Sequence, residues 1–332
     1  MTPLGEILAA RIRSGGPILF SEFMDAALYH PELGYYRSPR DPFGTQGDFF
    51  TASQLQPVFG RLVAAAIRQY LPAGAAPTDF TVAEWGAGRA ELTEALAEFH
   101  YIPIDSGSGE VPATFEGVVF SNELFDALPV DLAQRCGVEW RMIRVSFGDG
   151  RFQWHAAERL EEQWRHYASD LAAPLEDRPD VLIELPVRLR PVMETMVSRC
   201  RGGAFIAIDY GYTAREVVRF PQGTLMSYRR HQAFDDVLAS PGEQDITAHV
   251  PFTYLERCAA ECGMSAAKLE NFSQFLLRAG ETDQFAAALE APDEASAMRL
   301  RLQLKTLLFG MGETFRVFSA LIARPGMGSQ KS

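Results

Sequence analysis

The chain has 332 residues, of which 47% are hydrophobic, and it carries a formal net charge of −12 at pH 7. A chain of this length can bury a large core, either as one elaborated domain or as two unequal ones. The acidic balance argues against a nucleic-acid-binding surface, which requires a basic stripe, and favours neutral or cationic partners. The sequence holds no apolar run of the roughly 18 residues that a membrane span needs, so no span is expected.

The four cysteines and six histidines give no indication of a metal site. No C-x-x-C pair occurs, and no two histidines have the i, i+4 spacing of a helical metal site. Cys258 and Cys262 lie four residues apart on an expected helix, where they are interpreted as buried thiols of a cytoplasmic protein. No metal is therefore predicted, and the cytoplasm is the expected location.

Residues 1–75 are expected to form N-terminal helices and a long loop. Apolar residues at Leu4, Ile7, Leu8 and Ile12 predict an amphipathic helix rather than a signal peptide. From His30 to Thr51 the chain is rich in glycine, proline and aromatic residues. A loop of this length in a compact protein is typical of a lid or a binding segment, so this loop is expected to cover a ligand.

The most informative segment covers residues 80–99 and contains Glu84, Gly86 and Gly88. A short apolar run, a Gly-x-Gly turn and an apolar pattern of helical period predict a strand, a tight turn and a helix. The glycines permit positive φ and allow a ligand to approach bare backbone. The start of the following helix would favour a carboxylate or a phosphate.

The residues around this turn distinguish between ligands. Glu91 occupies the third position of the dinucleotide fingerprint, and no Gly-Lys-Ser/Thr follows to make a P-loop. Glu84 would repel a pyrophosphate, whereas it suits a cationic ligand that carries a carboxylate, such as S-adenosylmethionine. A glycine turn in an α/β fold that binds no nucleotide is the alternative.

Strands and helices alternate along residues 76–330, the second expected domain. Strands are predicted at residues 101–105, 118–120, 181–184, 204–211 and 269–277. Helices are predicted at residues 158–171, between the strands 181–184 and 204–211, and over residues 298–322. Residues 136–180 are interpreted as an insertion that begins with a hairpin turning at 148–150. The alternation predicts an α/β fold whose mostly parallel sheet has helices on both faces.

Polar residues follow several of these strands. In an open parallel sheet, ligands bind outside the carboxyl ends of the strands. Glu84, Asp105, Asn122 and Asp209 each come at such an end, and Asp105 could accept both hydroxyls of a ribose. Single residues of this kind often cap helices or turns, but four strand ends together favour a binding site.

Several long motifs resemble the MidA-type methyltransferases, a family that includes the mitochondrial complex I assembly factor that methylates a protein arginine. The motifs are Gly34-Tyr35-Tyr36, Asp41-Pro42-Phe43-Gly44, Gly47-Asp48-Phe49-Phe50-Thr51, Glu84-x-Gly86-x-Gly88-Arg89, Ser121-Asn122-Glu123-Leu124-Phe125-Asp126-Ala127-Leu128-Pro129-Val130, Gly223-Thr224-Leu225 and Gln244-Asp245-Ile246-Thr247-Ala248-His249-Val250. The resemblance implies a class I, Rossmann-like fold that uses S-adenosylmethionine as cofactor. It also implies a protein substrate, such as a subunit of a respiratory complex, and a homodimer is compatible with it.

The resemblance places the cofactor-binding residues in the lid and at the strand ends. They are Gly47, Asp48, Phe49, Thr51, Glu84, Gly86, Gly88, Asp105 and Asn122. In this assignment the glycine turn holds the methionine part, Glu84 favours its ammonium, and Asp48 closes the lid.

An arginine substrate adds a chemical demand. Guanidinium is always protonated at neutral pH, so carboxylates must bind it and take up a proton. Glu123 and Asp126, with Asn122, are the candidate catalytic residues, and their i, i+3 spacing would turn both carboxylates the same way if the loop enters a helix there. Asp245 and His249 could line the acceptor side, although His249 can equally be a structural histidine.

Some residues depart from the family pattern. Gln54 aligns with a glutamate of the family, and the segment between Gly88 and Asn122 is shorter than in other members. Asp105 would replace a family glutamate, while Pro103 is awkward in a central strand. Three functions therefore stay open: protein arginine methylation, methylation of a small molecule on oxygen or nitrogen, and a degenerate assembly or binding factor.

Overall fold

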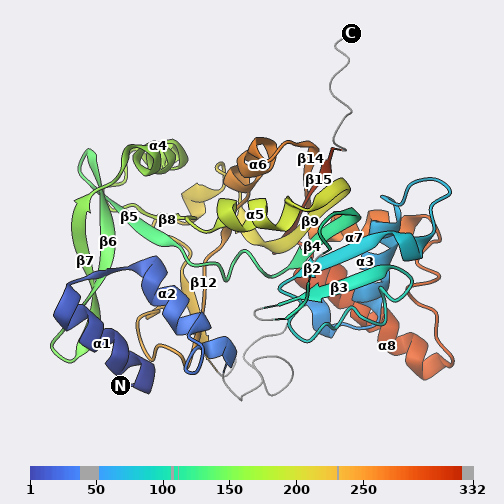
Figure 1. The fold of residues 1–332 in the computed structure, drawn as a ribbon, viewed down its shortest axis with the longest axis horizontal. Coiled ribbons are helices and arrows are strands. Elements are labelled where there is room, and N and C mark those ends of the chain that lie inside the picture. Colours follow the sequence, from blue (N-terminus) through green and yellow to red (C-terminus); the bar gives the residue numbers. More distant parts are fainter. Residues whose placement is uncertain (38–51, 106–107, 111, 230–231, 324–332) are drawn as a thin grey trace, which may run out of the picture. The chain divides into compact units, whose positions relative to one another are not determined.

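The computed structural model describes residues 1–37, 52–105, 108–110, 112–229 and 232–323, and the chain divides into two compact units (Figure 1). Unit 1 comprises Met1–Phe50, Phe125–Arg190 and Tyr212–Thr253. Unit 2 comprises Thr51–Leu124, Pro191–Gly211 and Tyr254–Ser332. The expected ranges of 1–75 and 76–330 do not coincide with these units, because the insertion at 136–180 groups with the N-terminal helices.

Unit 2 is built on a sheet in the order β14-β15-β9-β4-β2-β3. The strands are β2 (Thr81–Trp85), β3 (His100–Ile104), β4 (Phe115–Asn122), β9 (Cys200–Tyr212), β14 (Met264–Asn271) and β15 (Phe315–Ile322). From β3 to β9 all neighbours are parallel, and β15 is antiparallel to both β9 and β14. The strands predicted at 101–105, 118–120 and 204–211 are confirmed, and Pro103 is accommodated because β3 lies at the edge of the sheet.

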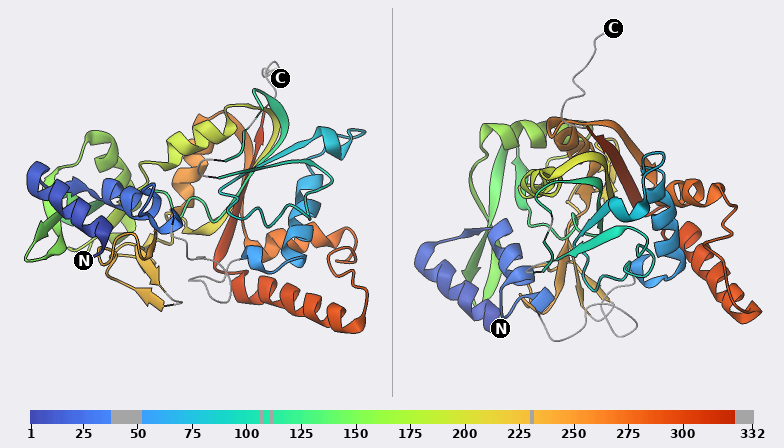
Figure 2. Two further views of the ribbon diagram at one scale, coloured as in Figure 1. Left: turned by 60° about the horizontal axis from the view of Figure 1, so that its bottom comes forward. Right: turned by 45° about the vertical axis from the view of Figure 1, so that its right-hand side comes forward.

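Helices cover both faces of this sheet, as Figures 1 and 2 show. On one side lie α3 (Val58–Arg68), α7 (Phe272–Glu281) and α8 (Glu294–Lys305), and on the other lie α5 (Leu189–Val197) and α6 (Phe252–Glu261). Buried side chains of α3 and α7 pack against inner residues of the sheet such as Phe120 and Ile206. Since β2, β4 and β9 are buried on both faces, their sequences are almost continuously apolar.

Unit 1 contains an antiparallel sheet in the order β1-β6-β5-β8, with β7 paired to β6. Its strands are β1 (Ile18–Leu19), β5 (Asp131–Cys136), β6 (Glu139–Gly148), β7 (Arg151–Arg159) and β8 (Leu182–Leu185). The hairpin predicted at 148–150 is confirmed, and α4 (Glu162–Leu171) follows it. The expectation that 181–184 belongs to the parallel sheet is wrong, because β8 pairs antiparallel with β5.

Two helices pack on the sheet of unit 1. The first, α1 (Pro3–Gly15), begins at Thr2, whose hydroxyl accepts a hydrogen bond from the Gly5 N–H at 3.0 Å. Leu4, Leu8 and Ile12 of α1 are buried with the apolar side of α2 (Phe20–Tyr29) against β5 and β6. A small sheet in the order β11-β10-β12 completes unit 1, with β10 (Met226–Arg229), β11 (Gln232–Phe234) and β12 (Asp245–Thr247).

Two C-terminal predictions need correction. The strand expected over 269–277 ends at Asn271, which caps α7 together with Gln274. The helical pattern expected over 298–322 ends as α8 at Lys305, passes through a π-helix (Thr306–Met311) and becomes β15. The helical backbone ends at Met311, residues 312–314 form a turn, and the mostly buried residues of 315–320 suit an inner strand between β9 and β14.

Candidate active site

The glycine turn follows β2 directly and is closed by β3. Gly86 has φ of 74°, and the N–H groups of Gly86 and Ala87 both donate to the Ile104 carbonyl, at 2.9 and 3.1 Å. A Cβ at position 86 would lie 3.0 Å from Leu124 Cδ1. Only glycine satisfies both the backbone angle and this close packing, so the turn and the segment after β4 fit tightly together.

The helix predicted after the turn does not form. Gly88 and Ala90 have φ of 53° and 55°, in the left-handed region, and residues 88–98 form successive turns. Leu92, Leu96 and Phe99 are nevertheless buried, so the apolar pattern predicted the packing but not the backbone. The helix N-terminus expected as an anion site is therefore absent from this described segment.

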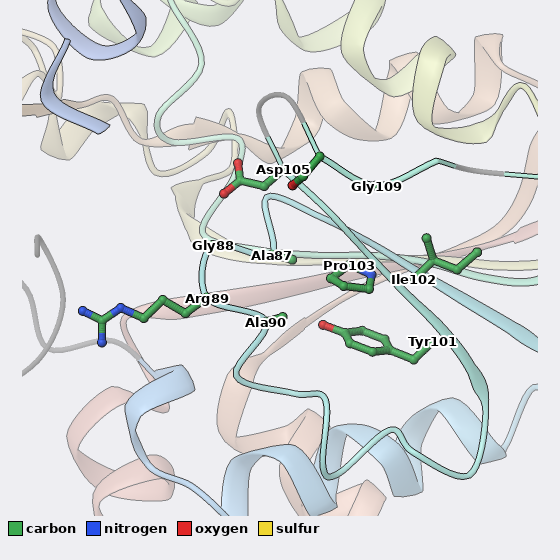
Figure 3. A pocket seen from close by; sticks show the side chains of 10 residues that line it. Ala87, Gly88, Arg89, Ala90, Tyr101, Ile102, Pro103, Asp105 and Gly109 are labelled. Atoms are coloured by element: carbon green, nitrogen blue, oxygen red, sulfur yellow. The ribbon is translucent and has the colours of Figure 1, made fainter. Parts of the chain in front are cut away.

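A pocket of about 470 Å³ lies beside this turn within unit 2 (Figure 3). It is lined by Ala87, Gly88, Arg89, Ala90, Tyr101, Ile102, Pro103, Asp105, Ser108 and Gly109. Its volume falls in the usual range of small-molecule sites, roughly 300–1,000 Å³. The pocket is lined by both Gly88 and Asp105, two of the residues proposed to bind the cofactor.

Asp105 is exposed just after the end of β3, and its backbone pairs with that of Ser108. The Asp105 N–H donates to the Ser108 carbonyl at 3.1 Å, and the Ser108 N–H donates back to Asp105 at 2.9 Å. Both residues line the pocket. Figure 3 shows the Tyr101 hydroxyl directed toward Ala90, whereas the Arg89 side chain extends away from the other labelled side chains.

Glu84 lies in β2, just before the glycine turn, and is only 5% exposed. The Tyr101 hydroxyl donates a hydrogen bond to Glu84 Oε2 at 2.5 Å. Burial raises the pKa of Glu84 to about 7, the Tyr101 hydrogen bond opposes that rise, and the charge of Glu91 adds to it. At neutral pH the side chain is therefore balanced between its acid and its carboxylate, rather than being the fixed negative charge assumed from the sequence.

This balance predicts a pH-dependent stability. Folding raises the pKa of Glu84 from 4.5 to about 7, so the folded protein binds this proton more tightly than the unfolded chain does. The contribution of Glu84 to the free energy of unfolding is therefore fully present below pH 4.5. The contribution is lost as the pH rises through 7, which amounts to about 3 kcal/mol. In denaturant titrations from pH 4.5 to 8 without cofactor, the Glu84→Gln variant is expected to lack this loss. An identical pH profile in both proteins would show that Glu84 is not the titrating group.

The end of β4 presents Ser121, Asn122 and Glu123. Glu123 has φ of 53°, which is strained for a residue with a side chain, and its N–H donates to the Ile208 carbonyl at 2.9 Å. The Asn122 side chain donates to Glu123 Oε1 at 3.0 Å. Strained backbone of this kind persists where the surrounding structure enforces it. The next residue, Leu124, packs on the turn at Gly86.

Three buried polar atoms near these strand ends have no hydrogen-bond partner within the described ranges. They are Trp85 Nε1, Ser121 Oγ and Asn122 Oδ1. Buried polar groups are normally satisfied, so unpaired ones suggest a binding or catalytic role. Asp209, by contrast, is fully buried inside β9 rather than at its end, and it accepts a hydrogen bond from the Tyr210 N–H at 2.9 Å.

Asp126, Asp245 and His249 belong to unit 1. Residues 125–128 form a turn, so the expected helix that would align Glu123 with Asp126 is wrong, since Pro129 and the left-handed Glu123 flank a non-helical segment. Asp126 is buried, and its carbonyl accepts a hydrogen bond from the Ala248 N–H at 2.9 Å.

Asp245 is buried and accepts a hydrogen bond from the Tyr36 hydroxyl at 3.1 Å. Burial raises the pKa of Tyr36, and the charges of Asp245 and Asp126 raise it further. Both aspartates therefore lie near this tyrosine in unit 1. Sequence reasoning missed the contact because Tyr36 and Asp245 are 209 positions apart, although both fall in motifs of the family.

His249 is held by its backbone and by a neighbouring ring. Its N–H donates to Thr224 Oγ1 at 2.9 Å, and its imidazole meets Phe220 edge to face at 5.2 Å. Burial and the charge of Arg219 lower the pKa of His249, so the ring is neutral at physiological pH. The four predicted lid residues Gly47, Asp48, Phe49 and Thr51 lie outside the described residues.

Tyr101 is a pocket residue that sequence reasoning did not identify as functional. Only the alternation of side chains along residues 100–104, with Tyr101 opposite Val82, could have suggested its position. Where the structure is described, no cluster of metal-binding side chains occurs. Every helix in the described part of the chain is too short or too polar to span a bilayer.

The α/β sheet of unit 2, with its glycine turn and polar strand ends, defines a class I methyltransferase fold. A Burkholderia thailandensis protein crystallised with S-adenosyl-homocysteine and described as a "likely methyl transferase" matches with a TM-score of 0.86 and 28% identity, over 97% of this chain and 92% of that one. The model of the family described as "Putative S-adenosyl-L-methionine-dependent methyltransferase" matches residues 102–269. The chain belongs to this family and is a methyltransferase that uses S-adenosylmethionine.

Relatives with assigned names extend over nearly the whole chain. The human and mouse proteins named "Protein arginine methyltransferase NDUFAF7, mitochondrial" are each 25% identical, over 97% of this chain and 84% and 85% of their own lengths. The human alignment has 388 positions against 332 residues here. This length difference agrees with a chain that is shortened relative to its relatives.

The residues of unit 2 fit S-adenosylmethionine. A Cβ at Gly86 would be crowded by Leu124, Asn122 Oδ1 is an unpaired acceptor among the described residues, and Asp105 offers a carboxylate at the pocket. Acceptors suit the ribose hydroxyls and the cationic groups of this cofactor. A pocket filled by side chains would have favoured a degenerate, non-catalytic protein, whereas this pocket is open.

Proposed function

We propose that this protein transfers the methyl group of S-adenosylmethionine to an arginine side chain of a protein. The observation that carries the proposal is Glu123, whose backbone is strained and whose carboxylate accepts a hydrogen bond from Asn122. It directly precedes Leu124, which packs on the turn that contains Gly86. The names of the vertebrate relatives support the same substrate class. When bound, the cofactor supplies a methyl group that is already activated on a sulfonium.

In this proposal different strand ends of unit 2 bind different parts of the cofactor. Asp105 receives the ribose hydroxyls, and Gly86, Gly88 and Glu84 hold the methionine part. The lid residues Gly47, Asp48, Phe49 and Thr51 cover the cofactor, as the family resemblance implies. Together these residues would orient the cofactor and exclude water, which is the main contribution a protein makes to a methyl transfer of this kind.

Glu123 is proposed to bind the guanidinium of the substrate. A carboxylate accepts two parallel hydrogen bonds from an arginine side chain and fixes its plane. Asn122 keeps the carboxylate in place through the bond to Oε1, measured at 3.0 Å. Asp126 keeps its proposed catalytic role, and Asp245 and His249 their proposed role in binding the substrate, on the strength of the family motifs in which they lie.

We also propose a first substrate to test and a cellular compartment for this protein. A respiratory-complex subunit is the first protein to test, because the resemblance in the sequence points to it. Cys136, Cys200 and Cys258 are free thiols, which supports a reducing compartment, and we propose the cytoplasm, although the vertebrate relatives are named mitochondrial.

The test is transfer of radiolabelled methyl groups to proteins. Purified protein and labelled S-adenosylmethionine are incubated with a bacterial extract, and the protein and small-molecule fractions are separated. Label in methylated arginine after acid hydrolysis is the expected result, absent with the Glu123→Gln variant. Label confined to small molecules would replace the proposal with the small-molecule function, and no label despite cofactor binding would favour a non-catalytic factor.

A further inference from the structure

Tyr101 connects the pocket with a buried carboxyl group. Its ring lines the pocket, and its hydroxyl donates to Glu84 Oε2 at 2.5 Å. In the parallel register Tyr101 is opposite Val82, so Tyr101 and Glu84 project from the same face of two neighbouring strands. The hydrogen bond therefore runs diagonally from the edge strand β3 to the strand that leads into the glycine turn.

The surroundings of Glu84 make this hydrogen bond important. The carboxyl is 5% exposed, and among the residues that the structure describes the titratable groups that shift its pKa are Tyr101 from β3 and Glu91 from the turns after Gly88. Neither of these groups is a cation. A buried carboxyl without a cationic neighbour tends to keep its proton. Within the described part of the chain, the donor that stabilises its ionised form is Tyr101.

We propose that Tyr101 is a positioning residue that aims the Glu84 carboxyl and keeps it ready to ionise, so that binding of the cofactor's ammonium group expels the Glu84 proton to the solvent. The proposal rests on the role suggested for Glu84 in binding the methionine part. The proton balance is simple: free protein carries Glu84 as the acid below neutrality, and the complex carries it as the carboxylate. A fraction of a proton is released with each cofactor bound.

Isothermal titration with S-adenosylhomocysteine measures this release. At pH 6, titrations in phosphate and in imidazole buffer give the number of protons released from the difference in observed heat. The wild-type protein is expected to release close to one proton per ligand, because a group with a pKa of about 7 is mostly protonated there. Glu84→Gln is expected to release none.

The Tyr101→Phe variant removes the hydroxyl that binds Glu84 and keeps the ring that lines the pocket, so it tests the positioning role apart from packing. Loss of a hydrogen bond to a charged group is expected to weaken S-adenosylhomocysteine binding about tenfold at pH 6. It should also move the midpoint of the pH dependence of Kd upward, since the carboxylate loses its donor. Tyr70→Phe, the same change at another partly buried tyrosine of unit 2, serves as the control and should move neither quantity.

The outcomes distinguish a failure of the inference about Tyr101 from a failure of the proposed function on which it rests. If wild-type protein binds the ligand but Tyr101→Phe keeps the wild-type pH profile, the role of Tyr101 is structural and the inference is overturned. Equal proton release in the wild type and Glu84→Gln would also overturn it. If wild-type protein does not bind S-adenosylhomocysteine at all, the proposed function itself fails.

Discussion

Gly86→Val is expected to weaken binding of S-adenosylhomocysteine by more than about a hundredfold. The added Cβ would lie 3.0 Å from Leu124 Cδ1, and φ of 74° is unfavourable for a branched side chain. Relief of both strains must move the turn or the segment that follows β4, and both border the proposed site. The backbone strain alone should lower the unfolding free energy by about 1–3 kcal/mol. Calorimetric titration gives the affinity, and denaturant unfolding gives the stability.

A matched control separates strain from the site. Gly74 of unit 2 also has positive φ, at 81°, but a Cβ added there would have no atom within 4 Å. Gly74→Val should therefore lose stability and keep wild-type affinity. Wild-type affinity in Gly86→Val would show that the cofactor binds elsewhere.

Glu123→Gln is expected to lower kcat for methyl transfer by a factor of about 100 to 1,000. The amide cannot bind guanidinium as a charged acceptor or take up a proton, and groups in such roles contribute about this much. The affinity for S-adenosylhomocysteine should change by less than about threefold, because the proposed contact of Glu123 is with the acceptor. Single-turnover assays with the labelled cofactor, alongside calorimetry, measure the two quantities separately.

Two further variants test whether Glu123 is kept for function. Glu116→Gln alters an exposed glutamate on the same strand and should leave kcat unchanged. Glu123→Gly removes the strain of φ at 53° and should raise the unfolding free energy by about 1 kcal/mol while removing activity. If Glu123→Gln keeps kcat within about threefold of wild type, the carboxylate has no catalytic part.

The sequence predicted the parallel strands and their polar ends well, for a physical reason. Short apolar runs such as those ending at Glu84 and Asn122 are bounded by turn residues, and this pattern is local. The pattern also predicted which side chains of residues 88–99 are buried. It missed the backbone there, because a left-handed conformation at Ala90 is not visible in helix propensity.

The features that sequence reasoning missed depend on distant contacts. The hydrogen bond from Tyr101 to Glu84 needs the register of two strands, and the one from Tyr36 to Asp245 joins opposite ends of unit 1's sequence. β8 was placed in the wrong sheet because a short buried strand looks alike in parallel and antiparallel surroundings. The sequence indicated the chemistry of the individual residues, but it did not indicate which distant residues lie beside them in the fold.

The position of β15 sets the order in which this protein can be completed during synthesis. Among the strands of the described residues this one comes last along the chain, yet it lies between β9 and β14 in the sheet of unit 2. Until residues 315–322 have left the ribosome, β9 and β14 each present an open edge, and open edges invite pairing with other chains. A nascent chain therefore carries its glycine turn and polar strand ends long before the sheet that supports them can close.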